Sequence, residues 1–206
     1  MRKSADPLTA LGPARLAALL LSQPPSCGPV RLVAVDGHAG SGKTTFAARL
    51  AAELGGAPVL HLDDLATHGS FFGWAGRLTE QVLAPLAQGR VAHYTPYDWT
   101  RRTFPAGADA AAQLPPEPVV LIEGVGAGRR ALRPYLACLL WMDVPAAQAW
   151  RRGRRRDGAQ LAGFWTAWTR AETTHFAEDP SYSYANFVVH RGGQGFEVRT
   201  GPARHR

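Results

Sequence analysis

Residues 37–44 read GHAGSGKT, which matches the complete pattern G-x-x-x-x-G-K-[ST] of a phosphate-binding loop. The chain contains only two lysines, Lys3 and Lys43, and the second stands where such a loop needs its lysine. A loop of this kind joins a strand to a helix, because its N–H groups must converge on phosphate oxygens at the positive end of the helix dipole. This pattern therefore constrains the fold more than any other feature of the chain.

The residues on both sides of the loop provide the strand and the helix. Residues 31–36 (RLVAVD) form a short apolar run typical of a buried parallel strand. Residues 44–54 (TTFAARLAAEL) are rich in Ala and Leu and end at Gly55, which predicts a helix with a glycine stop.

Similar strand and helix patterns alternate along the rest of the chain. The predicted strands are 58–62, 119–123, 138–144 and 185–190, and the predicted helices are 77–88, 129–137, one that begins at Pro145, and 161–176. Residues 91–104 indicate a hairpin or lid-like excursion, and 106–118, rich in Ala and Pro, indicate a surface connection. The alternation predicts a three-layer α/β fold with a parallel sheet flanked by helices.

Length and composition favour one cytoplasmic domain. The 206 residues suffice for a single α/β core, with a first helix at about 8–22 and a lid at about 145–160. Cys27 and Cys138 provide neither a disulfide framework nor metal-ligand spacing, and no apolar run reaches transmembrane length. We therefore expect a cytoplasmic protein that does not span a membrane, either a monomer or a homo-oligomer.

The chain has more basic than acidic residues, which suits an anionic ligand. The net charge is +7 and the sequence pI is about 10.1. Such a charge suits ATP and also nucleic acid. No aromatic stacking platform interleaves with the arginine clusters, which argues against nucleic acid as the partner.

Other phosphate-loop classes lack their further motifs here. A guanine-reading Asn-Lys-x-Asp element is excluded because no lysine follows Lys43, and no Asp-x-x-Gly switch sequence is present. Residues 192–194 (GGQ) faintly resemble a transporter-ATPase signature, but no strand with a terminal acid follows them, so we expect a turn. A small-molecule kinase remains.

The loop residues predict the nucleotide contacts. Glycines permit the backbone angles that the loop needs, Lys43 adds a positive charge near the β- and γ-phosphates, and the Thr44 hydroxyl is expected to bind Mg²⁺. The predicted nucleotide-binding residues are Gly37, His38, Ala39, Gly40, Ser41, Gly42, Lys43, Thr44 and Thr45.

Over residues 31–192 the chain resembles the uridine kinase family of P-loop kinases. The matching segments are VAVDGHAGSGKTT, LDDL at 62–65, TPYDW at 95–99, VVLIEGV at 119–125, the arginine-rich helix ending at Asp157, and YANFVV at 184–189. The resemblance implies ATP and Mg²⁺ as cofactors, with Asp63 accepting the proton of the attacking hydroxyl and Glu123 binding the metal beside Thr44. A carboxylate at a strand end opposite the loop also suits the demands of phosphoryl transfer, and Asp63 is a further candidate for binding the metal.

The resemblance implies an acceptor site at Tyr97 and Asp98. The sequence departs from the family there, because Arg101 and Arg102 replace a pyrimidine-reading histidine and Leu65 replaces an aromatic residue. Paired guanidinium groups suit an acceptor with a carboxylate or phosphate, or else they are solvated. Asp64 is expected either to contact the acceptor or a metal-bound water, or to cap the following turn.

Two arginines four residues apart, Arg152 and Arg156, lie on one helical face and resemble lid arginines that stabilise transition-state charge. Glu172 and His175 are further candidates for the acceptor site. We therefore predict an ATP-dependent phosphotransferase acting on a small-molecule hydroxyl, foremost a nucleoside. The alternatives are a nucleotide, vitamin precursor, sugar or antibiotic as acceptor, and a non-catalytic ATP-binding protein.

Overall fold

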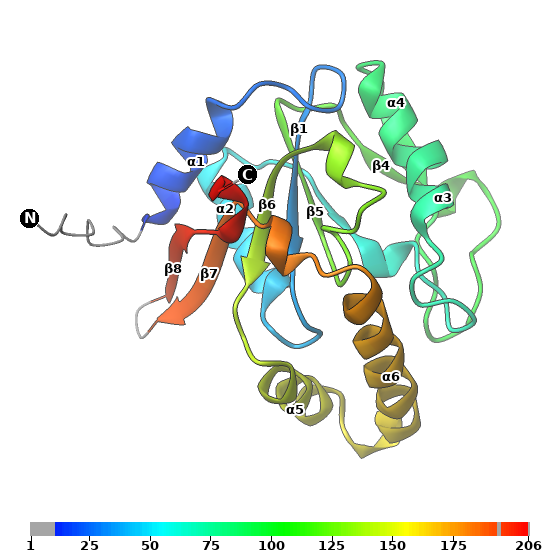
Figure 1. Cartoon of the computed structure of the whole chain (residues 1–206). Coiled ribbons are helices and arrows are strands. Elements are labelled where there is room, and N and C mark those ends of the chain that lie inside the picture. The colour runs from blue at the N-terminus through cyan, green and yellow to red at the C-terminus, as the bar shows by residue number, and fades with distance from the viewer. Residues whose placement is uncertain (1–10, 193–194, 206) are drawn as a thin grey trace, which may run out of the picture.

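The computed structural model describes residues 11–192 and 195–205, which build a central sheet with helices on both faces (Figure 1). The sheet has the strand order β2-β5-β1-β6-β7-β8. Its strands are β1 (Arg31–Asp36), β2 (Val59–His61), β5 (Val119–Glu123), β6 (Leu136–Met142), β7 (Phe187–Gly192) and β8 (Gly195–Thr200). All neighbouring pairs are parallel except β7 and β8, which are antiparallel.

Apolar side chains from both faces of the sheet are buried, as expected for parallel strands covered by helices. On one face, β1, β5 and β6 pack against α1 (Pro13–Leu21) and α2 (Lys43–Glu53). The other face packs against a helix formed by α3 (Ala75–Leu78), a π-helical turn (Thr79–Leu83) and α4 (Ala84–Ala87). The predicted three-layer α/β fold is confirmed, with a sheet that is mostly rather than wholly parallel.

The π-helical turn has a local cause in the sequence. Pro85 has no N–H to donate to the carbonyl of Gln81, so an α-helical bond is missing at this point. The helix widens there, and the N–H of Ala84 bonds to the carbonyl of Thr79 instead. The helix predicted at 77–88 is thus present with this interruption.

Three element predictions were wrong. Residues 129–137 form only a short 3-10 turn (Arg133–Tyr135), because Pro134 limits the turn and β6 begins directly after it. The predicted surface connection 106–118 contains β4 (Ala112–Leu114), which pairs with β3 (Ala92–Tyr94) and closes the hairpin. Strand β8 was not predicted, because its charged residues Glu197 and Arg199 interrupt the apolar run at the sheet edge.

Two predictions lie partly outside the described residues. Of the helix expected at 8–22, the part from Pro13 onward is present as α1, and residues 8–10 are not described. Of the turn expected at 192–194, Gly192 ends β7, and residues 193–194 are not described.

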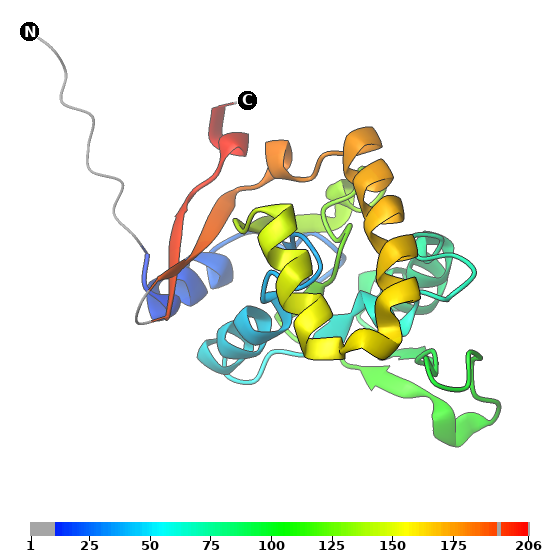
Figure 2. The same ribbon diagram turned by 90° about the horizontal axis from the view of Figure 1, so that it is seen from below.

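Helices α5 (Ala146–Asp157) and α6 (Ala162–Glu178) lie across the carboxyl ends of the central strands (Figures 1 and 2). They pack closely where Gly153 of α5 meets the ring of Trp165 in α6. A Cβ atom on Gly153 would lie 2.2 Å from a carbon of that ring. The absence of a side chain at Gly153 therefore sets the separation of the two helices.

We expect Gly153→Ala to lower the free energy of unfolding by about 1–3 kcal/mol, because the added methyl overlaps the indole ring. The matched control is Gly163→Ala in α6, where a Cβ would meet nothing within 4 Å. The control should stabilise the protein by up to about 1 kcal/mol through helix propensity. Urea unfolding of both variants tests this, and equal effects would contradict the packing assigned to Gly153.

Candidate active site

The phosphate-binding loop connects β1 to α2, as the motif predicts. Gly37, Gly40 and Gly42 have φ values of 141°, 84° and 101°, which residues with a side chain rarely adopt. At Gly40 a Cβ would also lie 2.2 Å from the carbonyl oxygen of Ala149 in α5. The glycines thus permit both the turn and the close approach of α5.

Lys43 is near the end of the loop, and its side chain bonds back to carbonyl groups of the same loop. Its side chain is 7% exposed, and its ammonium donates to the carbonyl oxygens of Gly37 at 2.9 Å and His38 at 3.1 Å. These bonds hold the positive charge over the concave side of the loop, where a phosphate would lie.

Thr44 and Glu123 meet at the ends of α2 and β5. The Thr44 hydroxyl donates to Oε1 of Glu123 at 2.8 Å, and Nδ1 of His61 donates to the same oxygen at 2.6 Å. Burial acts to raise the pKa of Glu123, but the His61 bond, the Lys43 charge and the Thr44 bond outweigh burial and lower it. The bond to Glu123 in turn raises the pKa of His61.

This pair of oxygen ligands fits Mg²⁺. The ion typically takes one or two protein oxygens and completes an octahedron with water and substrate phosphates. No cluster of three or more His, Cys, Asp or Glu side chains suited to a metal occurs within residues 11–192 and 195–205. The hydroxyl of Thr44 and the carboxylate of Glu123 match the sparse site that Mg²⁺ accepts.

Asp63 follows β2 in a short 3-10 turn (Leu62–Asp64) and faces the loop. Its main-chain carbonyl accepts a hydrogen bond from the Trp99 indole at 3.0 Å. The Asp63 side chain is exposed and lines the cleft that contains the loop. Desolvation by the surrounding protein raises the pKa of Asp63, and the Lys43 charge opposes the shift.

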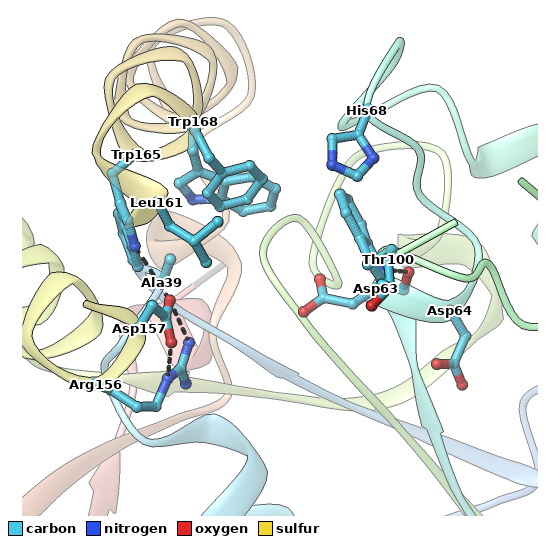
Figure 3. Close-up of a pocket in the computed structure, with 12 residues that line it drawn as sticks. Ala39, Asp63, Asp64, His68, Thr100, Arg156, Asp157, Leu161, Trp165 and Trp168 are labelled. Atoms are coloured by element: carbon cyan, nitrogen blue, oxygen red, sulfur yellow. Dashed lines mark hydrogen bonds and ion pairs between the residues drawn. The ribbon is translucent and has the colours of Figure 1, made fainter. Parts of the chain in front are cut away.

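Asp64 lies beside Asp63 but makes different contacts. Its carboxylate accepts a hydrogen bond from the Tyr94 hydroxyl at 3.4 Å and does not cap the turn. Burial raises the pKa of Asp64, and burial together with that carboxylate raises the pKa of Tyr94 to about 12. Figure 3 shows the Asp64 side chain directed away from that of Asp63.

Two adjoining cavities share Asp63. The first, of about 310 Å³, contains the phosphate-binding loop, Thr44 and Glu123 and is called here the phosphate cleft. The second, of about 500 Å³, is called here the aromatic cavity, because its lining includes the rings of His68, Trp99, Phe164, Trp165 and Trp168. Both are lined by Ala39, Asp63, Arg156 and Trp168.

Three arginines line the phosphate cleft. Arg152 and Arg156 do so from α5, which agrees with their predicted common face, and Arg191 does so from β7. The Arg152 Nη1 is buried without a hydrogen-bond partner among the described residues. Arg191 was not predicted, since no motif marks an arginine near the end of an edge hairpin.

Of the predicted acceptor residues, Asp64 lines the aromatic cavity, whereas those of the hairpin, Tyr97, Asp98, Arg101 and Arg102, do not. The Tyr97 ring is buried, and its hydroxyl bonds to His68 at 3.2 Å. The Asp98 carboxylate accepts bonds from the N–H groups of Thr100 and Arg101 and from the Arg101 guanidinium. This turn engages Asp98 within the hairpin and directs Arg101 into solvent, with 80% of its side chain exposed.

Arg102 is also exposed, and its φ of 56° places it in the left-handed region. Neither Arg101 nor Arg102 lines the aromatic cavity or the phosphate cleft. The structure therefore does not bring the arginine pair to an acceptor.

Glu172 is fully buried and accepts four hydrogen bonds. His38 Nδ1 and Trp150 Nε1 bond to Oε1 at 2.7 and 2.9 Å, and the Ala39 N–H and Trp168 Nε1 bond to Oε2 at 3.2 and 2.7 Å. Glu172 thus joins the phosphate-binding loop to α5 and α6. It lines neither cavity, although it was a candidate for the acceptor site.

His175, the other candidate from α6, is buried beside the Phe72 ring, with centroids 4.5 Å apart and planes at 9°. Burial lowers its pKa. His175 also lines neither cavity.

Asp36, at the end of β1, anchors the loop from below. Its Oδ1 accepts from the N–H groups of Gly37 at 2.7 Å and Gly126 at 2.9 Å, and its Oδ2 accepts from Gly128 at 2.8 Å. In the sequence, only the position of an acid at the end of an apolar strand marks this role. These bonds fix the loop against the segment that follows β5.

Replacing Glu172 by Gln should lower the free energy of unfolding by about 1–3 kcal/mol, because an amide NH₂ would face N–H donors. The same variant should bind ATP more weakly, since the loop loses its bonds to α6. Urea unfolding and ATP titration measure the two effects. Glu178→Gln, an exposed site on the same helix, serves as control with a change within about 0.5 kcal/mol. An unchanged Glu172→Gln variant would contradict the anchoring role.

The chain is similar to known proteins in its structure, whereas neither a family model nor a curated sequence matches it. Within residues 11–192 and 195–205, no helix combines the length and apolar character needed to cross a bilayer.

The solved structures that are similar in fold include two proteins described as kinases. One is a "possible uridine kinase" from Bacillus stearothermophilus, with a TM-score of 0.60 and 21% identity over 84% of this chain and 94% of that one. The other is a "putative fructose transport system kinase" from Silicibacter sp. TM1040, with a TM-score of 0.56 and 23% identity over 81% of this chain and 89% of that one. The chain therefore has the mostly parallel P-loop fold of these two proteins.

Proposed function

We propose that this chain is a kinase that transfers the γ-phosphate of ATP, with Mg²⁺, to a hydroxyl group of a small molecule. The observation that carries the proposal is the position of Asp63, which lines both the phosphate cleft and the aromatic cavity. A carboxylate at the boundary of a phosphate site and a second cavity is suited to orient a hydroxyl towards a phosphate.

The remaining residues of the cleft have complementary roles in the proposed reaction. The loop amides and Lys43 bind the phosphates, and Arg152 and Arg156 reduce the charge that repels the attacking oxygen. Thr44 and Glu123 would hold Mg²⁺, which neutralises charge on the β- and γ-phosphates when bound. The acceptor oxygen forms a bond to the γ-phosphorus, the bond to the bridging oxygen of ADP breaks, and Asp63 takes the hydroxyl proton.

A nucleoside of the uridine or cytidine type is the first candidate acceptor. The proposal rests on the fold shared with a protein named as a possible uridine kinase and on the motifs that resemble that family. Kinases for other alcohols share the same transfer apparatus, so a screen of hydroxyl acceptors for ADP formation separates these substrates. A fold-level likeness alone does not fix the acceptor.

Asp63→Asn separates a kinase from a protein that only binds ATP. The amide cannot accept the proton, so turnover should fall by a factor of roughly 10² or more while ATP affinity stays close to that of the wild type. Coupled ADP release and titration with a non-hydrolysable ATP analogue measure the two quantities. The control is Asp109→Asn, an exposed residue that lines neither cavity. Unchanged turnover in Asp63→Asn would refute the role of Asp63.

The paired variants Thr44→Val and Thr44→Ser test the metal site. Valine keeps the shape of the side chain but removes the hydroxyl, so half-maximal activity should require at least about tenfold more Mg²⁺. Serine keeps the hydroxyl and should need a concentration close to that of the wild type. Magnesium titration of the ADP-release rate distinguishes them, and the same requirement in both variants would exclude Thr44 as a ligand.

A further inference from the structure

His61 and Glu123 are neighbours across two strands of the sheet. In the parallel pair of β2 and β5, the Cα atom of His61 is in register with that of Glu123. Side chains alternate between the two faces of a strand, and Val59 and Leu121, two residues earlier on each strand, both pack on the side of α1 and α2. The register therefore places both polar side chains beside the start of α2, where Thr44 lies.

The hydrogen bonds on the Glu123 carboxylate are unevenly shared between its oxygens. Thr44 and His61 both donate to Oε1, and none of the residues that the structure describes donates to Oε2. Glu123 lines the phosphate cleft, so Oε2 is the oxygen that remains for a further ligand. Resting on the kinase function proposed above, we propose that His61 is a positioning residue that orients Glu123 so that Oε2 serves Mg²⁺ or a water bound to it.

Two donors from different elements fix the carboxylate better than one. The last torsion of a glutamate side chain has broad preferences, so a carboxylate held by a single donor turns easily. Thr44 donates from α2 and His61 donates from β2, and together they determine the plane of the group. Metal ligands are commonly oriented by such outer hydrogen bonds, and losing one typically weakens metal binding by about 10–100-fold.

The surroundings of His61 favour this role over a packing role. Its side chain is 43% exposed, whereas that of Glu123 is 7% exposed. His61 does not line the phosphate cleft, so it is not placed to bind the phosphates itself. The only hydrogen bond that its ring makes to a described residue is the one to Glu123. The position of the Glu123 carboxylate is therefore what a change at His61 should affect first.

His61→Phe keeps an aromatic ring and removes the donor. A non-hydrolysable ATP analogue is titrated calorimetrically into the full chain, once with Mg²⁺ and once with EDTA, and the ratio of the two affinities measures the contribution of the metal site. We expect His61→Phe to lower this ratio by at least about fivefold, while the affinity in EDTA stays close to that of the wild type. An unchanged ratio, or equal losses under both conditions, would overturn the positioning role.

His61→Asn is the converse variant, because it removes the ring and keeps a donor. The amide N–H₂ of Asn stands at the δ position, where His has Nδ1, so it should restore the ratio to within about twofold of the wild type. His93→Ala, at an exposed histidine of β3 that lines neither cavity, should leave the ratio unchanged. A low ratio in both His61 variants would show that the ring matters rather than the bond, against the proposal.

A double variant tests whether His61 acts through Glu123. Glu123→Gln alone should lower the ratio, and adding His61→Phe should then change it by less than about twofold, since the carboxylate that His61 orients is already gone. A further fall of the same size as in the single His61→Phe variant would mean that His61 reaches the metal by another route, and the positioning role would be wrong.

The wild-type titrations separate this inference from the kinase function. If the analogue does not bind, the kinase function itself fails. If it binds equally with Mg²⁺ and with EDTA, the metal site fails and the role of His61 fails with it. If Mg²⁺ strengthens binding equally in the wild type and in His61→Phe, the kinase function stands and the role of His61 is refuted.

Discussion

Hydrogen bonds from the phosphate-binding loop to two buried carboxylates support the rest of the site. Asp36 holds the start of the loop to the segment after β5, and Glu172 holds the residues at its tip to α6. Buried carboxylates are costly unless each oxygen accepts bonds, and both oxygens of both residues do so here. The loop is thus fixed from two sides, so its amides need little rearrangement to receive a phosphate.

The parts of the site that follow from one motif or from the order of parallel strands were predictable. The motif at 37–44 determines its own turn, because glycines with positive φ and a following helix are needed for its N–H groups to converge. Glu123 ends the apolar strand β5, which lies beside β1 in the sheet, and this brings Glu123 to Thr44. Parallel strands place their carboxyl ends together, so acids at these ends meet without further information.

The parts that depend on which partner an individual polar side chain finds were not predictable. Glu172 meets Ala39 across more than a hundred residues of chain, and only the packing of α6 on the loop decides that it bonds there. Asp98 and Arg101 are of residue types that often bind substrates, but here they bond to each other within a local turn. The type of a residue indicates what its side chain is able to bind, whereas the fold decides which partners lie within its reach.

One oxygen of Glu172 accepts from both the Ala39 amide in the loop and the Trp168 indole in the cavity wall. A molecule that immobilises the Trp168 ring would therefore also hold Ala39 of the phosphate-binding loop in place. If the chain is the kinase proposed above, thermodynamic linkage makes such coupling reciprocal, so ATP and the acceptor would change each other's affinity by the same factor. The shared oxygen would then couple the two halves of the site.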